Sequence, residues 1–308
     1  MSTFPDGTDT APSARIVNLL ELAEADPTQE ELEEFLRDPA PDVRRTALSV
    51  LSESAEDWAQ ASPVFAAALT DEDRAVRVAA TKLVRELSEV LVPGPEFDAA
   101  LRRATGHRDA VVRIEAIDAL WRHRLTTVEE LRGLLADPDV AVRCEVVLGF
   151  VSLDALDALD RAGHDPEPAV RLAVTRGLGS VGDPRGAALL IRLAGDPEFL
   201  VRAAALSAMA HTGCSEDAAL IATTALSDEA WEVRQGGANA LSAAAPDERG
   251  TAALAEALAD PNLDVRKAAV KALGAWLPSR PAIRPALEAA LSDVDADVRA
   301  HARMSLTA

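Results

Sequence analysis

The chain has 308 residues, and its 51 acidic side chains outnumber its 31 basic ones to give a net charge of −20. This balance opposes general binding to nucleic acid or to an anionic membrane surface, because phosphate groups are bound by clustered cations. Two cysteines give no disulfide framework, and no apolar run approaches the roughly 18 residues of a membrane span, so we expect a cytoplasmic protein that does not contact membranes.

The first elements of the chain follow from composition and spacing. Residues 1–12 are polar and carry proline and glycine, which predicts a disordered lead-in. Residues 13–26 contain the apolar-periodic run RIVNLLELAEA, which predicts a helix that caps the N-terminal end. From residue 27 to 308 we expect one array of helical hairpins, at about 27–54, 57–89, 95–124, 127–151, 153–179, 183–211, 215–243, 247–275 and 281–306.

The array is indicated by a Val-Arg step that returns nine times, at a mean spacing of about 32 residues. The steps lie at Val43-Arg44, Val76-Arg77, Val112-Arg113, Val142-Arg143, Val170-Arg171, Val201-Arg202, Val233-Arg234, Val265-Arg266 and Val298-Arg299. One such unit cannot bury its apolar face alone, so the copies are expected to stack into a solenoid.

Each copy is interpreted as two short helices joined by a turn. Counting from the Val of each step as position 0, an Asp stands at −5 in eight copies, and apolar or small residues return at +4, +7 and +8. That spacing marks one face of an α-helix, and the Asp is expected to cap it. The arginine at +1 is expected to pair with an Asp of an inter-helix turn, which would form a ladder along the array. A stripe of arginines that binds nucleic acid is the alternative.

These residues carry a family resemblance. The stretch from Asp260-Pro261 through Val265, Arg266, Ala269, Ala272 and Leu273 resembles the HEAT-repeat signature, especially that of the phycobilisome-lyase (E–Z) type. The resemblance implies an all-α solenoid of about nine HEAT-like hairpins behind the N-terminal cap helix. The third copy departs from the signature, because His107 replaces the Asp at −5. Proteins with this repeat include chromophore-lyase subunits, scaffolds, di-iron hydroxylases and DNA glycosylases, so the resemblance specifies the fold and not the function.

The candidate site lies on the second helix of each hairpin, at positions +2, +6 and +9, which point away from the 0/+4/+7/+8 face. We expect this face to line a concave groove, and copies two to five place apolar side chains there. The candidate partner-binding residues are Val78, Lys82, Arg85, Ile114, Trp121, Cys144, Leu148, Val151, Leu172 and Arg176. Exposed contiguous apolar surface marks binding sites, but self-association or burial in the core would explain the same residues.

The charges in this region indicate the kind of partner. Six arginines lie between Leu101 and Arg124, where they suit an acidic amphipathic peptide or an anionic, partly apolar small molecule, or else balance the acidic array locally. Glu115 and Glu145 depart from the small or modest residues found at +3 in the other copies, apart from His301. They are interpreted as ion-pair partners of Arg113, Arg143 or Arg176, and an acid–base pair is the alternative. 

No catalytic motif is apparent, the five histidines lack metal-ligand spacing, and no cofactor is expected. The favoured hypothesis is a non-catalytic protein-binding scaffold that uses the concave groove. One alternative is a lyase-like accessory protein that holds an apolar chromophore near Cys144. A HEAT-repeat DNA glycosylase that uses Asp118 or Glu115 beside Trp121 is a further alternative, which the acidic charge opposes.

Overall fold

The computed structural model describes residues 11–307, and in that range the chain is helical, without a β-strand. The helices are α1 (Pro12–Ala23), α2 (Gln29–Leu36), α3 (Pro41–Ser54), α4 (Trp58–Ala68), α5 (Arg74–Glu86), α6 (Pro95–Ala104), α7 (Ala110–Arg122), α8 (Val128–Leu134), α9 (Val140–Ser152), α10 (Leu156–Ala162), α11 (Pro168–Val181), α12 (Ala187–Leu193), α13 (Phe199–Thr212), α14 (Glu216–Ala225), α15 (Trp231–Ser242), α16 (Glu248–Ala257), α17 (Leu263–Trp276), α18 (Arg284–Ala290) and α19 (Ala296–Thr307). Short 3-10 helices, η1 (Pro184–Gly186) and η2 (Pro281–Ile283), precede α12 and α18. The predicted all-α solenoid of hairpins is confirmed.

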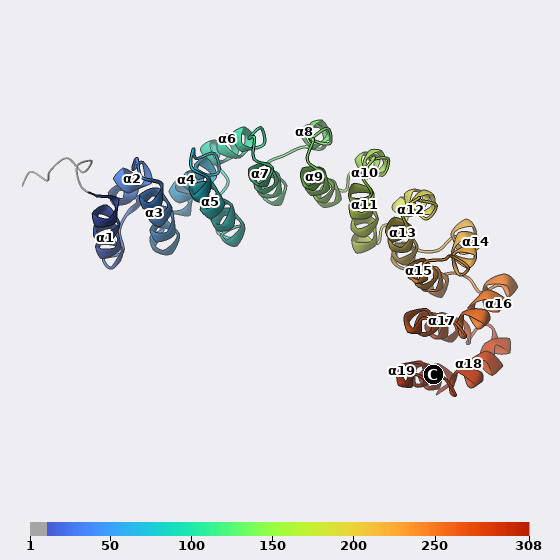
Figure 1. The fold of residues 1–308 in the computed structure, drawn as a ribbon. Helices are drawn as coiled ribbons and strands as arrows, with labels where there is room; N and C mark the ends of the chain where they lie inside the picture. Colours follow the sequence, from blue (N-terminus) through green and yellow to red (C-terminus); the bar gives the residue numbers. More distant parts are fainter. Residues whose placement is uncertain (1–10, 308) are drawn as a thin grey trace, which may run out of the picture. The chain divides into compact units, whose positions relative to one another are not determined.

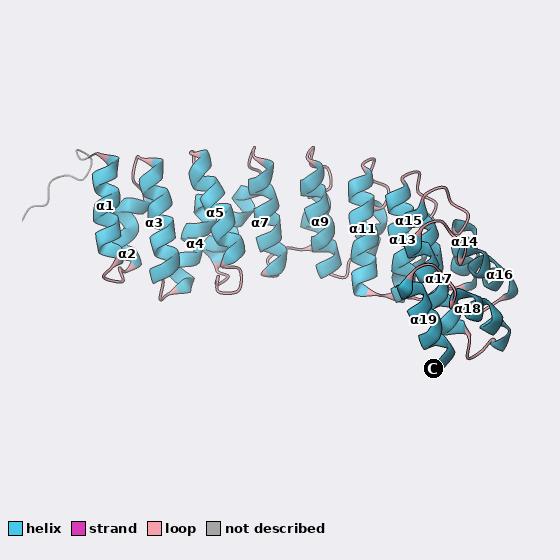
Figure 2. Cartoon of the chain, turned by 60° about the horizontal axis from the view of Figure 1, so that its bottom comes forward, coloured by secondary structure: helices cyan, strands magenta, loops and turns pink. Residues whose placement is uncertain are grey.

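The hairpins form two compact units, here called unit 1, which ends at Leu153, and unit 2, which begins at Asp154. In unit 1 the second helices α3, α5, α7 and α9 follow α1 side by side, and the first helices α2, α4, α6 and α8 form the other layer (Figures 1 and 2). Unit 2 repeats this arrangement, with second helices α11, α13, α15, α17 and α19. Second helices pack on one another and on the first helix of their own hairpin.

The core lies between the two layers, as the helical spacing predicts. In α17, Val265, Ala269 and Ala272 at positions 0, +4 and +7 are all fully buried. Small residues there let neighbouring helices approach closely. One such close approach involves Gly236 on α15, where an added Cβ would lie 2.8 Å from the backbone oxygen of Ala203 on α13.

Helix α1 occupies the place expected for the cap helix. If Arg15 is taken as position +1, positions 0, +4 and +7 of α1 are Ala14, Asn18 and Glu21. All three are exposed. Polar residues at +4 and +7 suit a face that meets water and not a preceding hairpin. The predicted lead-in, residues 1–12, falls almost entirely outside the described residues.

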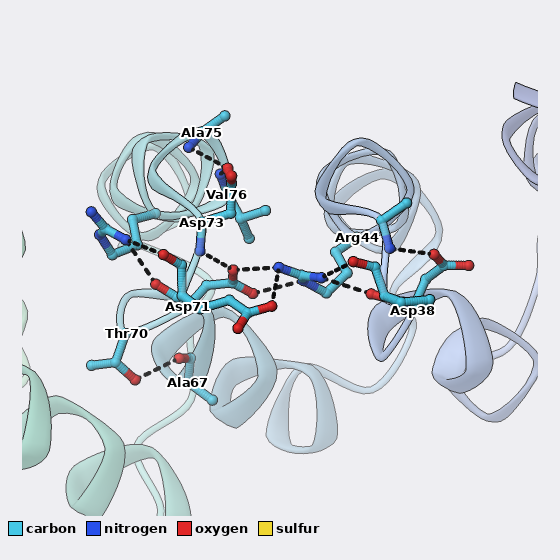
Figure 3. Close-up of polar contacts among 12 residues, drawn as sticks. Asp38, Arg44, Ala67, Thr70, Asp71, Asp73, Ala75 and Val76 are labelled. Atoms are coloured by element: carbon cyan, nitrogen blue, oxygen red, sulfur yellow. Dashed lines mark hydrogen bonds and ion pairs between the residues drawn. The ribbon is translucent and has the colours of Figure 1, made fainter. Parts of the chain in front are cut away.

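The turn between the two helices of a hairpin corrects one expectation. The Asp at −5 does not cap the second helix, because it lies two residues before the N-cap. In the second hairpin, Asp71 accepts a hydrogen bond from the amide of Asp73, and Asp73 is the N-cap that accepts from Ala75 and Val76 (Figure 3). The Asp at −5 therefore closes the turn, which leaves its second oxygen free for another partner.

Candidate functional site

The repeated arginine at +1 connects consecutive hairpins. Arg44 donates through Nε and Nη2 to both carboxylate oxygens of Asp71, at 2.9 and 2.7 Å (Figure 3). Its Nη1 donates to the backbone oxygen of Asp38, 2.7 Å away, in the turn of its own hairpin. One guanidinium thus holds its own turn and the next one together, which is the predicted ladder.

The same bidentate pairing recurs through both units. The further pairs are Arg113–Asp137, Arg171–Asp196, Arg202–Asp228, Arg234–Asp260 and Arg266–Asp293. An additional pair joins Arg15 on α1 to Asp38, at 2.6 and 2.8 Å. Sequence reasoning missed Arg15, although the run D-T-A-P-S-A-R, residues 9–15, parallels D-P-A-P-D-V-R, residues 38–44.

The third copy shows how the ladder adapts to His107. The ring Nδ1 of His107 accepts the amide of Asp109, 3.1 Å away, and so closes the turn as the missing Asp would. A neutral imidazole cannot act as the anionic partner of Arg77, whose Nη2 reaches Asp109 only at 3.6 Å. The Nε of Arg77 is buried without a hydrogen-bond partner among the described residues.

Several ladder carboxylates are held in their charged form by a lowered pKa, namely Asp38, Asp137, Asp196, Asp260 and Asp293. Burial alone would raise the pKa of Asp137, but the guanidinium of Arg113 and the amide of Asp139 outweigh that effect and lower the pKa. The arginines are correspondingly enclosed, since Arg44, Arg77 and Arg143 are buried. These guanidiniums are structural, and they do not form the exposed cationic stripe that nucleic-acid binding would need.

The ten predicted site residues all lie outside the core. Val78 and Leu148 are 55% and 45% exposed. Lys82, Arg85 and Arg176 are also exposed, and Ile114, Trp121, Cys144, Val151 and Leu172 are half-buried. The interpretation that these residues pack in the core is therefore wrong. Leu172 and Arg176 belong to α11 in unit 2; the other eight lie on α5, α7 and α9 and are called here the second-helix face of unit 1.

A shallow hollow lies at the edge of the second-helix face of unit 1, between α3 and α5. A groove of about 610 Å³ lies there, with Arg45 on the α3 side and Val78 and Lys82 on the α5 side. Val78 is among the most exposed large apolar side chains of the described chain. The groove therefore combines an apolar side chain with cationic edges.

Glu115 on α7 is completely enclosed. Its Oε2 accepts a hydrogen bond from Nη2 of Arg85 on α5, at 2.7 Å, and the Arg85 side chain is 65% exposed whereas that of Glu115 is 1% exposed. The Oε1 atom of Glu115 is buried without a hydrogen-bond partner among the described residues. Glu115 is thus an ion-pair partner, as predicted, but its partner is Arg85 and none of the expected arginines, Arg113, Arg143 or Arg176.

Farther along this face, a hydrogen bond joins Trp121 to Glu145. The indole Nε1 of Trp121 on α7 donates to Oε1 of Glu145 on α9, at 2.8 Å. Gly149 on α9 lies next to this ring and makes its tightest contact with Leu131, because a Cβ at Gly149 would lie 2.7 Å from Cδ1 of Leu131. Arg122 lies over the same ring, 4.7 Å from its centroid, and donates to Asp118 at 2.7 Å.

Glu115, Asp118 and Glu145 form a carboxylate cluster, in which the pKa values of Glu115 and Glu145 are raised. Burial raises the pKa of Glu115 to about 7; Arg85 opposes the shift, and the charges of Asp118 and Glu145 add to it. Burial also raises the pKa of Glu145, against the hydrogen bond from Trp121. Three carboxylates face two guanidiniums in a poorly solvated site, so the cluster favours uptake of a proton.

The geometry limits what the cluster can do chemically. Glu115 is 0% exposed and Asp118 is 7% exposed, so neither presents its carboxylate to a bulky substrate. The indole N–H of Trp121 is already donated to Glu145. Among residues 11–307, no three His, Cys, Asp or Glu side chains are placed to hold a metal ion. The arrangement suits charge recognition at the arginines better than acid–base catalysis.

Sequence reasoning also missed a larger groove on the first-helix layer of unit 1. It measures about 710 Å³ and lies between α2, α4 and α6, above Leu48 on α3. Its walls include Leu36, Pro63 and Ala99. No repeat position marks it, because its width depends on how far apart the first helices lie.

Comparisons with known proteins agree with this geometry. The HEAT-repeat pattern matches residues 154–242 and 220–307, which together make up unit 2. A crystal structure of an engineered protein is similar with a TM-score of 0.55 and 18% identity, over 97% of this chain and 92% of that one, a likeness in fold alone. Among curated proteins there is no match.

None of the helices in the described part of the chain is both long and apolar enough to cross a membrane. The repeat match spans half of the sequence, and the hairpins and their Arg–Asp ladder run through both units. The protein belongs to the HEAT-repeat family.

Proposed function

We propose that this protein is a non-catalytic scaffold that binds a segment of a partner protein along the second-helix face of unit 1. One observation carries the proposal: unburied apolar side chains follow one another on neighbouring helices, from Val78 on α5 through Ile114 on α7 to Leu148 on α9. Contiguous apolar surface of this kind is typical of binding sites. HEAT-repeat solenoids commonly serve as protein-interaction scaffolds.

The chemistry of the face supports a helical or extended segment with an apolar side and an acidic side. The apolar residues would take up the apolar side, as in helix-in-groove recognition. Lys82, Arg85 and Arg122 surround them with side chains that are 71%, 65% and 50% exposed. Acidic side chains of the partner would lie against these cations.

The enclosure of the carboxylates supports a role without catalysis. A general acid or base must come within hydrogen-bond reach of its substrate, and the Glu115 side chain is 1% exposed. A lyase-like role would place a chromophore on the same face, beside half-buried Cys144.

The test compares a face variant with a matched control as baits in lysate of the source cells. The face variant carries Val78→Asp and Leu148→Asp. The control carries Val90→Asp and Val92→Asp, which alter two valines of the α5–α6 loop that are 42% and 40% exposed. Circular dichroism first establishes that both variants keep the helix content of the wild type.

We expect the wild type and the control to retain a common protein partner that the face variant loses. Retention of the same partners by all three baits would refute the proposal. A bait that carries visible absorbance, lost in the face variant, would instead support the chromophore-binding alternative.

A further inference from the structure

On and beside the second-helix face of unit 1, two exposed arginines, Arg85 and Arg122, pair with enclosed carboxylates. The Arg85 side chain is 65% exposed while its partner Glu115 is 1% exposed, and Arg122 is 50% exposed while Asp118 is 10% exposed. An approaching molecule therefore meets these two guanidiniums before it meets their carboxylate partners. Arginine forks are well suited to bind a carboxylate.

The carboxylate of Glu115, which balances the charge of Arg85, has too few hydrogen-bond partners. Glu115 uses one oxygen for Arg85 and leaves its buried Oε1 without a hydrogen-bond partner among the described residues. Its charged neighbours are Arg85 from α5, Asp118 on its own helix and Glu145 from α9. On the α6 side, Phe97 lies against His123, whose charge interactions are with Asp118, Arg122 and Glu89. Two like charges therefore face one ionised Glu115.

We propose that an acidic side chain of the partner segment binds Arg85 and Arg122, and that Glu115 takes up a proton as it does so. The inference rests on the proposed function and specifies the partner and its regulation. In the free protein the guanidinium of Arg85 forms an ion pair with Glu115. When Glu115 is protonated, the charge of Arg85 is available to the partner carboxylate, and the added proton stays on the Glu115 carboxyl group.

Binding and protonation then reinforce each other. The attraction of Arg85 is what holds the pKa of Glu115 down to about 7 against burial and the two neighbouring carboxylates. A bound anion weakens that attraction, so the pKa rises in the complex. By linkage, affinity increases as pH falls, by up to about tenfold per pH unit, in the range where Glu115 is ionised in the free protein and protonated in the complex.

The probe is a rhodamine-labelled amphipathic peptide of about 18 residues, rich in Leu and Glu, acetylated and amidated at its ends so that its own groups do not titrate near neutral pH. A second peptide has Gln in place of every Glu. Fluorescence anisotropy gives Kd for both between about pH 6 and pH 9. The full-length variants are Glu115→Gln and Arg85→Gln, with Arg37→Gln on α2, another exposed ion-pair arginine, as the control.

We expect the wild type and the Arg37→Gln control to bind the acidic peptide about tenfold more tightly at pH 6.5 than at pH 8.5. Glu115→Gln should bind tightly at every pH, and Arg85→Gln should weaken binding of the acidic peptide alone. Equal Kd values across this range, or an unchanged pH slope in Glu115→Gln, would overturn the inference but leave the scaffold proposal standing. Failure of both peptides to bind, with every variant folded, would contradict the proposed function as well.

Discussion

The Arg–Asp ladder predicts that removing one ladder carboxylate uncouples neighbouring hairpins. Asp260 accepts Nε and Nη2 of Arg234 at 2.7 and 3.0 Å, and it also accepts the amide of Asn262 at 2.8 Å. The two paired side chains are 15% and 8% exposed. Asp260→Ala leaves an enclosed guanidinium without its anion, so we expect a loss of about 3 kcal/mol in the free energy of unfolding.

The assay is a double-mutant cycle in urea. Asp260→Ala, Arg234→Met and the double variant are unfolded in urea and followed by circular dichroism and by tryptophan fluorescence, to which Trp276, buried on α17, contributes. The double variant should cost about 2 kcal/mol less than the sum of the singles.

An exposed ion pair provides the control for this cycle. Arg37 and Glu33 on the first-helix layer are 77% and 52% exposed, and their coupling should be about 0.3 kcal/mol. If the Arg234–Asp260 coupling is no larger than that of the exposed pair, the ladder does not join the hairpins and the reasoning is refuted.

Three further predictions concern single positions. His107→Asp should stabilise the protein by about 1 kcal/mol, because the buried Nε of Arg77 gains a carboxylate; urea midpoints that do not rise would contradict this. Wild-type stability should fall as pH rises from about 4.5 to 7, since the folded state keeps the proton of Glu115, with its pKa of about 7, after the unfolded state has lost it. Glu115→Gln should remove this fall of about 3 kcal/mol, and an unaltered pH profile would refute the assignment. Gly236→Val should lower the melting temperature, because even a Cβ would lie 2.8 Å from the backbone oxygen of Ala203, whereas an unchanged value would mean that the helices separate freely.

Much of this fold is predictable because the sequence repeats one hairpin pattern nine times. The hairpins lie where the Val-Arg step places them, and the pairing of Arg44 with Asp71 follows from two residues that recur together. His107 departs from the pattern, but its ring still closes the turn, so the fold tolerates the exception. The capping role of the Asp at −5 was wrong because Asp73 lies closer to the helix and takes that place.

The candidate site was only partly predictable. The helical wheel identifies Val78 and Leu148 as exposed, since that depends on one helix alone. It does not identify Arg85 as the partner of Glu115, because that contact joins position +9 of one helix to +3 of the next. Which residues meet across that gap depends on how neighbouring helices are staggered, and the repeat spacing does not contain this information.

The most direct test of the central claim is photo-cross-linking in the source cells. A benzophenone amino acid replaces Val78 on the second-helix face of unit 1, and in a parallel protein it replaces Val92 in the α5–α6 loop, which is also exposed. We predict adducts from Val78 alone, with mass spectrometry placing them in an acidic amphipathic segment of one partner. Equal adducts from both positions, or adducts at Val78 with basic segments, would contradict the account.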